Sequence, residues 1–397
     1  MDFSHHFSDE NIPFGIASSD KHHDPQAVTR LGTTVLFLAD LQDNGLFGGL
    51  PKNVFKQSTL NEFAALPRSK SVKVRKKIQD VFRQGGIEGF LSTAQEDVSL
   101  VTMHLPIEIK DFSGRIVIGS TKPPPSFFKF PIGYQGRTSS IVVSGTDIER
   151  PMGQFRDKSV TDPLSEKAII YGPSRQVDYE VELAVIVGKP LPMKQKLNAK
   201  DAEEHIFGFV ILNDWSARDI QGFEMNPLGP FNGKSLGTSI SPWVVTLEAL
   251  EHFKTGASPQ QKSLVSYLRS SKPSTYSITM EVEILTGSNA TKTGVCPVSS
   301  LYWSPPQLLA HAVSSGSALR TGDILATGTV SGSTDGSHGC LLETTEGGTK
   351  PLTLSDGSRR TYLEDGDVVR ITAVAGEASS GVGFGECIGR LTPSRTI

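Results

Sequence analysis

One segment, residues 176–187, constrains the fold more than any other part of this sequence. Apolar and polar residues alternate in it as far as Glu182, and from Leu183 to Val187 every residue is apolar. Successive side chains of a strand point to opposite faces, so the alternation predicts a β-strand. The apolar second half is typical of a strand that is buried on both faces.

The same periodicity places Glu180 and Glu182 side by side on one face of this strand, with Asp178 before them. Two adjacent carboxylates repel each other, and their burial is costly unless a cation lies between them. Two interpretations therefore stay open: a solvated polar face, or a buried cation site.

The rest of the chain also indicates a mainly β fold. The 39 glycines and 24 prolines favour many turns and short strands. Apolar runs predict further strands, and helical periodicity with end signals predicts a few helices. The predicted strands are 141–143, 206–212, 276–285, 324–326 and 368–373, and the predicted helices are 58–66, 72–83 and 304–315. Without a regular βαβ alternation, we expect a mixed, mainly β or α+β catalytic domain rather than a doubly wound sheet.

Composition excludes several functional classes. With 39 basic and 42 acidic residues, a net charge of −3 gives no general attraction to nucleic acid or to anionic lipid. The three cysteines are widely spaced and form no CxxC pair, which favours a reducing compartment. The start has no signal-peptide pattern, and no apolar run approaches the ~20 residues of a membrane span. We therefore expect a soluble, unsecreted protein of the cytoplasm. The glycine-rich residues 381–385 lack the GxGxxG spacing of a dinucleotide site.

A second set of polar residues follows the predicted strand 206–212. Asp214 lies where that strand ends, a place from which a side chain can reach a cleft, although a turn or helix cap is the simpler interpretation. Arg218 and Gln221 come next, and Lys234 lies among glycines without the spacing of a P-loop. A metal here would have only carboxylate ligands, which favours Mg²⁺, Ca²⁺ or Mn²⁺. The arginine, glutamine and lysine could stabilise negative charge on a substrate oxygen.

Several long blocks of the sequence resemble the fumarylacetoacetase family, also called the fumarylacetoacetate hydrolase family. They are residues 130–140, the strand with Glu180 and Glu182, and residues 213–221, 227–243 and 326–332, and residues 11–15 and 103–106 extend the resemblance to nearly the whole chain. The resemblance implies a small SH3-like barrel domain over residues 1–105 and a catalytic domain, a mixed β-sandwich roll, over residues 106–397. It also implies a homodimer that hydrolyses a carbon–carbon bond of 4-fumarylacetoacetate, giving fumarate and acetoacetate in the last step of tyrosine and phenylalanine breakdown.

The resemblance assigns roles to ten residues of this chain. The metal-binding carboxylates are Glu180, Glu182 and Asp214, with Lys234 and Thr238 around a second site, and the implied ions are Mg²⁺ and Ca²⁺. The groups that stabilise the oxyanion are Arg218, Gln221 and Lys234. The substrate contacts are Tyr134, Gln221 and Thr329. Glu343 matches the acid that orients the catalytic histidine.

The chain departs from the family pattern in the segment that should carry this histidine. No histidine occurs between His104 and His205, and the spacing from His104 to Tyr134 is about ten residues shorter than in the family. Counted from His104, the fourth metal-ligand position falls on Gly114, and Asp111 falls on an earlier aspartate of the pattern. Met225 stands where the family has a tyrosine.

Three hypotheses follow from this departure. The chain is a fumarylacetoacetase that lacks a short segment, for example through a misplaced splice boundary. Alternatively, it is a divergent member that acts on another β-diketone or oxoacid and activates water with Glu343 or a metal hydroxide. The third hypothesis is a non-catalytic dimeric binding protein. The retained site residues favour the first, and loss of the general base predicts activity reduced by roughly 10²–10⁴-fold.

Overall fold

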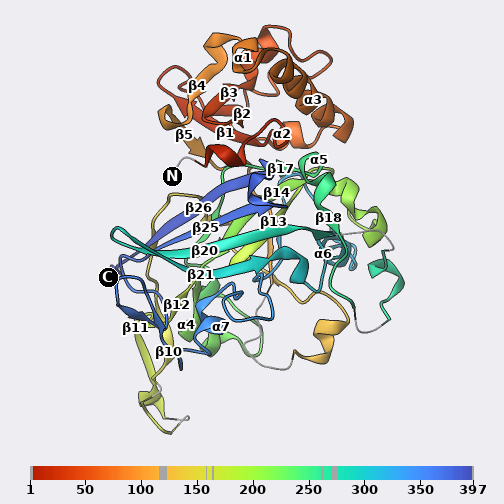
Figure 1. Cartoon of the computed structure of the whole chain (residues 1–397). Coiled ribbons are helices and arrows are strands. Elements are labelled where there is room, and N and C mark those ends of the chain that lie inside the picture. The colour runs from red at the N-terminus through yellow and green to blue at the C-terminus, as the bar shows by residue number, and fades with distance from the viewer. Residues whose placement is uncertain are drawn as a thin grey trace.

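A computed structural model describes residues 3–115, 123–157, 159–162, 165–260, 263–270 and 275–395. An N-terminal region packs on one side of a larger body that is built around two large sheets (Figure 1). The fold is mainly β with short helices, as the sequence predicts.

The N-terminal region has one five-stranded sheet in which every neighbouring pair is antiparallel, in the order β4-β3-β2-β1-β5. Its strands are β1 (Phe14–Ser19), β2 (Gln26–Leu31), β3 (Thr34–Phe37), β4 (Gln95–Asp97) and β5 (Val101–His104). The helices of this region are α1 (Leu38–Asp43), α2 (Asn61–Ala64) and α3 (Arg68–Gly85).

An eight-stranded sheet forms the centre of the larger body, in the order β7-β6-β22-β13-β14-β16-β8, with β17 also paired to β14. Its strands are β6 (Phe112–Gly114), β7 (Tyr134–Gln135), β8 (Ile141–Val143), β13 (Val181–Val187), β14 (Ile206–Asp214), β16 (Thr238–Ile240), β17 (Val245–Thr246) and β22 (Ile324–Ala326). The long strands β13 and β14 are antiparallel neighbours, so their residues face each other across the middle of the sheet.

A five-stranded sheet packs beside it, in the order β21-β20-β25-β26-β9. Its strands are β9 (Ile148–Glu149), β20 (Ile278–Thr286), β21 (Asn289–Pro297), β25 (Val368–Ala375) and β26 (Gly383–Thr392). Four short pairs complete the strands: β10 (Met152–Arg156) with β11 (Ile169–Pro173), β12 (Val177–Asp178) with β15 (Ser216–Ala217), β18 (Lys254–Thr255) with β19 (Thr275–Tyr276), and β23 (Leu352–Thr353) with β24 (Arg359–Arg360). The β10–β11 hairpin projects from the body (Figure 1).

The central sheet is covered on both faces, which explains the apolar second half of residues 176–187. Val181, Leu183 and Val185 pack in a core shared with the five-stranded sheet. Ala184 and Ile186 point the other way, into a core shared with residues of the N-terminal region. All seven residues of β13 are buried.

The remaining helices are α4 (Arg218–Glu224), α5 (Leu247–Leu250), α6 (Pro305–Ala312) and α7 (Leu341–Thr344). Helix α6 lies where residues 304–315 predict a helix, with Pro305 at its start and Gly316 in a positive-φ conformation beyond its end. Two other helical predictions are wrong in length: α2 is shorter than 58–66, and α3 begins four residues before 72. The sequence does not predict β21 or β26, because β21 begins with a mostly polar run and glycines interrupt the apolar alternation of β26.

Among the described residues, no helix is both long enough and apolar enough to cross a membrane.

Candidate metal centre and active site

The predicted strand 176–187 is interrupted in the structure, and the break lies among its acidic residues. Strand β12 ends at Asp178 and β13 begins at Val181, so the prediction of one continuous strand is wrong. At the break, the backbone N–H of Glu180 donates to the side-chain oxygen of Asn213 at 3.1 Å, and its carbonyl accepts from Asp214 N at 3.2 Å. Side chains still alternate across the break, because Tyr179 enters the core while Glu180 and Glu182 point away from it.

Glu180, Glu182 and Asp214 form a buried carboxylate cluster. Each is fully buried, and each offers an oxygen that lies within 4.8 Å of the others. The interpretation of Glu180 and Glu182 as a solvated polar face is therefore wrong. Asp214 is the last residue of β14 and caps no helix; it lies opposite Thr238 of β16 in the strand register.

Lys234 supplies a cation to this cluster. Its ammonium Nζ lies 2.6 Å from Glu180 Oε2 and 2.8 Å from Asp214 Oδ2, and the lysine is buried with them. Gly233, just before it, lies so close to Gln221 that a Cβ there would come within 2.5 Å of the Gln221 backbone nitrogen. This close approach brings Lys234 into the cluster from a short turn.

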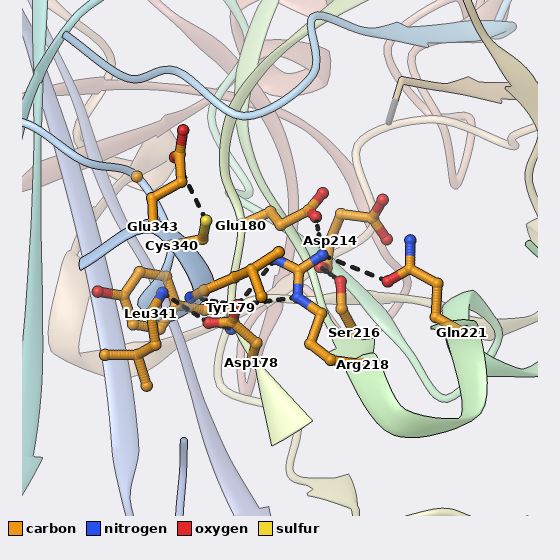
Figure 2. Close-up of polar contacts among 12 residues, drawn as sticks. Asp178, Tyr179, Glu180, Asp214, Ser216, Arg218, Gln221, Cys340, Leu341 and Glu343 are labelled. Carbon is orange, nitrogen blue, oxygen red and sulfur yellow. Dashed lines mark hydrogen bonds and ion pairs between the residues drawn. The ribbon is translucent and has the colours of Figure 1, made fainter. Parts of the chain in front are cut away.

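Arg218, at the start of α4, lies between two of the acidic residues and Gln221 (Figure 2). Its guanidinium contacts Asp178 Oδ2 through Nε at 2.9 Å and Glu180 Oε1 through Nη1 at 2.5 Å. Nη1 also lies 3.3 Å from Gln221 Oε1. Since the side-chain oxygen of Gln221 faces Arg218, its amide nitrogen points away and is free to donate to a ligand.

The charges of the cluster shift the pKa values of its members in opposite directions. Burial opposes the ionisation of Glu180, but Lys234 and Arg218 outweigh it and hold its pKa below the ordinary value. Burial, together with the neighbouring Asp214 and Glu180, raises the pKa of Glu182 well above its ordinary value. Burial, followed by the charge of Glu180, likewise raises the pKa of Asp214. Glu182 is thus the carboxyl that most needs a proton or a further cation.

The cluster fits a divalent metal ion. Glu182 Oε1 and Asp214 Oδ1 are buried and accept no hydrogen bond from the described residues, whereas the other oxygens of Glu180 and Asp214 have donors. Carboxylate oxygens are the ligand atoms that Mg²⁺ and Ca²⁺ prefer, and two of them are unsatisfied here. Glu180, Glu182 and Asp214 are therefore the residues that could hold such an ion.

Gly114, the position on which the count from His104 places a fourth metal ligand, is covered by the side chain of Tyr134. Gly114 lies beside Tyr134 in the β6–β7 pair, and a Cβ at Gly114 would lie 2.5 Å from the Tyr134 ring. The Tyr134 hydroxyl donates to Asp214 Oδ2 at 2.6 Å. Tyr134 thus reaches the cluster over the space that a side chain at position 114 would need. Asp111 is not part of the cluster, since its side chain is 52% exposed and its Oδ2 lies 3.7 Å from Arg320 Nη2.

Glu343, at the third position of α7, faces a separate cavity of about 640 Å³. Its Oε2 accepts from Ser331 Oγ at 2.5 Å and lies 3.3 Å from the Cys340 thiol. Thr329 lines the same cavity, and its hydroxyl is buried without a hydrogen-bond partner among the described residues. The described lining residues include no histidine, so Glu343 contacts a hydroxyl and a thiol in place of an imidazole.

Sequence reasoning missed the functional position of two residues. Asp178 connects the two halves of the site: its carboxylate accepts from Leu341 N at 2.8 Å and Leu342 N at 3.0 Å in α7, and it also binds Arg218. The alternation of residues 176–182 already places Asp178 on the acidic face, which is a signal that could have found it. Arg115 lines the cavity near Glu343, and no motif marked it. Residues 116–122, which follow Arg115 in the segment that departs from the family pattern, lie outside the described residues.

Two family models match the chain in order. The model described as fumarylacetoacetase N-terminal matches residues 10–106, and the one described as fumarylacetoacetate (FAA) hydrolase C-terminal matches residues 113–392.

Individual relatives align over almost the whole chain. A fumarylacetoacetase of Aspergillus fumigatus is 42% identical, over 98% of this chain and 96% of the relative. Those of Arabidopsis thaliana and Homo sapiens are 38% and 36% identical, each over 98% of this chain and 96% of the relative. The alignment with the Aspergillus protein spans 418 positions, more than the 397 residues of this chain, so the relative has residues that this chain lacks.

Solved structures share the fold at low identity. A fumarylacetoacetate hydrolase from Exiguobacterium antarcticum gives a TM-score of 0.53 at 18% identity, covering 97% of this chain and all of that one. A maleylpyruvate hydrolase from Sphingobium gives a TM-score of 0.53 at 16% identity, covering 96% of this chain and all of that one. The match of both family models and the high coverage of relatives from fungi, plants and animals show that the chain belongs to the fumarylacetoacetase family.

Proposed function

We propose that this protein hydrolyses the carbon–carbon bond between the two acyl parts of 4-fumarylacetoacetate, giving fumarate and acetoacetate. The observation that carries the proposal is the buried cluster of Glu180, Glu182 and Asp214 with Lys234, since such a concentration of charge is costly unless it serves a site. The curated relatives from three kingdoms bear the name of this activity.

The reaction adds one water molecule and breaks one carbon–carbon bond. The water oxygen bonds to the carbonyl carbon of the fumaryl part, and one water proton goes to a base. The bond to the methylene carbon then breaks, its electron pair stays on that carbon, and a proton returned there completes acetoacetate. The groups needed are a base, donors for the oxyanion and a site for the diketone.

Residues of this chain supply each group in the proposal. The Gln221 amide, which Arg218 turns outward, and the Lys234 ammonium would donate to the developing oxyanion. Tyr134 and Thr329 would contact the substrate. Glu343 would take the water proton directly, because no histidine is among the described residues that line its cavity.

A divalent ion on Glu180, Glu182 and Asp214 would polarise the substrate diketone. Carboxylate ligands suit Mg²⁺ and Ca²⁺, and we propose these two ions, with Lys234 and Thr238 beside a second site for Mg²⁺. Lys234 would meanwhile keep Glu180 ionised, as the lowered pKa of this carboxyl indicates.

We further propose a division at residue 105, with an SH3-like barrel before it and the catalytic domain after it. The all-antiparallel sheet β4-β3-β2-β1-β5 supports a separate N-terminal unit. A homodimer is also proposed. In such a dimer, the exposed side chains of Ile169 and Tyr171 on the projecting β10–β11 hairpin would pack against the second copy.

The test is an assay of purified protein that follows the loss of fumarylacetoacetate absorbance with Mg²⁺ or Ca²⁺ present. We expect measurable hydrolysis that is slow, by roughly 10²–10⁴-fold, relative to a variant in which a histidine-containing segment is restored after Ser113. Glu343→Gln should abolish the remaining activity while the protein stays folded. If Glu343→Gln hydrolyses the substrate as fast as the parent chain, Glu343 is not the base. If calorimetry detects no divalent-ion binding and the assay detects no turnover, the proposal fails and the hypothesis of a non-catalytic protein is favoured.

A further inference from the structure

The cavity beside Glu343 contains a buried guanidinium that no assigned role uses. Arg115 is 7% exposed and follows β6, which pairs in parallel with β22. The residue lines the cavity of about 640 Å³ together with Thr329 and Glu343. A buried arginine of this kind needs an anionic partner or several acceptors.

The described residues satisfy this guanidinium only in part. Nη1 donates to the carbonyl of Gly114 at 3.0 Å, and Nε is buried with no acceptor. Among the described residues no carboxylate forms an ion pair with Arg115, although the charge of Glu182 acts on it. Burial lowers the pKa of Arg115 to about 10, so the group remains a cation at neutral pH.

Two glycines leave the space that the Arg115 side chain occupies at the cavity wall. A Cβ at Gly133 would lie 2.1 Å from Arg115 Nη1, and a Cβ at Gly328 would lie 2.7 Å from Arg115 Cβ. Gly328 has φ +81°, a conformation that favours glycine, and its N–H donates to Glu182 Oε2 at 3.0 Å. Any larger residue at either position would push the arginine away, so the local backbone is shaped around this side chain.

A second unsatisfied donor lies in the same cavity. The Thr329 hydroxyl is buried without a partner among the described residues. The aromatic side chains of Phe127, Tyr302 and Trp303 form a further wall of the cavity, and the buried Tyr302 hydroxyl also lacks a partner among the described residues. A cation, a hydroxyl and a flat apolar wall together suit a carboxylate attached to a short unsaturated chain.

We propose that Arg115 and Thr329 form a carboxylate subsite that binds one acid end of the substrate. The inference rests on the proposed function for the identity of the substrate, which has a carboxylate at each end. Arg115 would donate through Nε and its terminal nitrogens, and Thr329 through its hydroxyl. The subsite would hold the conjugated chain against the aromatic wall, beside Glu343.

The experiment measures equilibrium binding of fumarate to the Mg²⁺-loaded protein by calorimetry, which requires no turnover. Charge-assisted hydrogen bonds are strong, so Arg115→Met should weaken fumarate binding by roughly 10- to 100-fold. Arg115→Lys, which keeps the charge, should weaken it less, and Thr329→Val by about 3- to 10-fold. Arg359→Met removes an exposed arginine that lines a different cavity and should leave binding unchanged.

Fumaramide, the neutral diamide of the same length, makes the test independent of variant folding. The parent protein should bind it much more weakly than fumarate, and Arg115→Met should not weaken it further. Equal fumarate affinity of the parent and Arg115→Met would overturn the subsite and leave Arg115 as a structural counter-charge for Glu182. Failure of the parent to bind fumarate would also overturn it. Fumarate binding that depends on Arg115, in a protein without hydrolysis, would support the subsite and contradict the proposed function.

Discussion

The carboxylate cluster and the cavity beside Glu343, the two halves of the site, differ in how their charged groups are paired. At the carboxylate cluster, Lys234 bridges Glu180 and Asp214 at 2.6 and 2.8 Å, and Tyr134 donates a further hydrogen bond. At the cavity, Arg115 Nε and the Thr329 hydroxyl have no partner among the described residues, and Glu343 contacts only neutral donors. The cluster pairs its charges with a buried lysine and leaves only Glu182 Oε1 and Asp214 Oδ1 without a donor among the described residues, whereas the cavity has a buried cation with no carboxylate partner among them.

This difference indicates what the departure from the family pattern costs. On the cluster side, the glycine at position 114 leaves no empty space. The Tyr134 ring lies where a larger side chain would be, and its hydroxyl donates to Asp214. The cavity side has no comparable replacement for the histidine among its described lining residues. We therefore expect substitutions in the cluster to change stability most, and substitutions in the cavity to change ligand binding and rate.

Lys234→Met should have the largest effect on stability. It leaves Glu180 and Asp214 buried without their ammonium, and breaking a buried ion pair costs about 3–5 kcal/mol. Urea unfolding in the presence of a chelator measures this loss. Excess Mg²⁺ should restore part of it, because an ion that binds only the folded state stabilises it.

The matched control is Lys189→Met, which removes an exposed lysine paired with exposed Glu204. Such pairs contribute about 0–1 kcal/mol, so the control should unfold almost like the parent chain. A loss of under 1 kcal/mol in Lys234→Met would show that the cluster is not held together by this charge.

Gly114→Asp should have the next largest effect and should act in opposite directions with and without metal. The new side chain must displace the Tyr134 ring, and overpacking of this kind costs about 1–3 kcal/mol in metal-free protein. It also adds a carboxylate ligand, which raises affinity for Ca²⁺. Calorimetric titration and unfolding with and without Ca²⁺ measure the two effects. Gly114→Asn has nearly the same size without the charge, and equal Ca²⁺ affinity in both variants would contradict a ligand role for this position.

The sequence predicts the members of the cluster better than it predicts their geometry. Strand periodicity identifies Glu180 and Glu182 as neighbours, and the alternation is retained although the strand breaks at Tyr179. The break could not be predicted, because it depends on the side chain of Asn213 from another strand. Contacts between elements that are distant in sequence decide such details.

The cavity was less predictable for a physical reason. Arg115 packs against Gly133 and Gly328, which come from two other parts of the chain, so no local pattern marks it. The role of Asp178 is also hard to predict locally. Its carboxylate oxygens accept hydrogen bonds from the backbone of α7 and from Arg218, which are distant in sequence. The fold class, by contrast, follows from glycine, proline and apolar periodicity, which are local signals.

The pH dependence of stability provides a further test of the cluster. Glu182 has a raised pKa in the folded protein, so the folded state binds more protons than the unfolded state above the ordinary carboxyl pKa of about 4.3. Stability of metal-free protein should therefore fall as pH rises through the raised pKa, by up to about 1.4 kcal/mol per pH unit for this group.

Glu182→Gln removes this contribution and should give a flatter profile in urea unfolding between pH 5 and pH 8. Saturating Mg²⁺ should flatten the parent profile as well, because metal ligands bind in the deprotonated form. Identical slopes in the parent and in Glu182→Gln would mean that this carboxyl is not protonated in the folded protein.

Ser331→Ala should have the smallest effect, since it acts on the cavity side. It removes the hydrogen bond of 2.5 Å to Glu343 Oε2, and a hydrogen bond to a charged group contributes about 1.5–3 kcal/mol when it is buried. Glu343 lines a cavity that admits water, so water can replace the lost donor and unfolding free energy should change by under about 1 kcal/mol. The hydroxyl also accepts from Gly339 N at 2.9 Å and so helps to fix the turn before α7.

We expect kcat of Ser331→Ala to fall a few-fold with KM unchanged in the fumarylacetoacetate assay, because the carboxylate remains but is less well oriented. A loss of stability as large as that of Lys234→Met would show that the cavity is as dependent on internal pairing as the cluster, and would remove the distinction between the two halves.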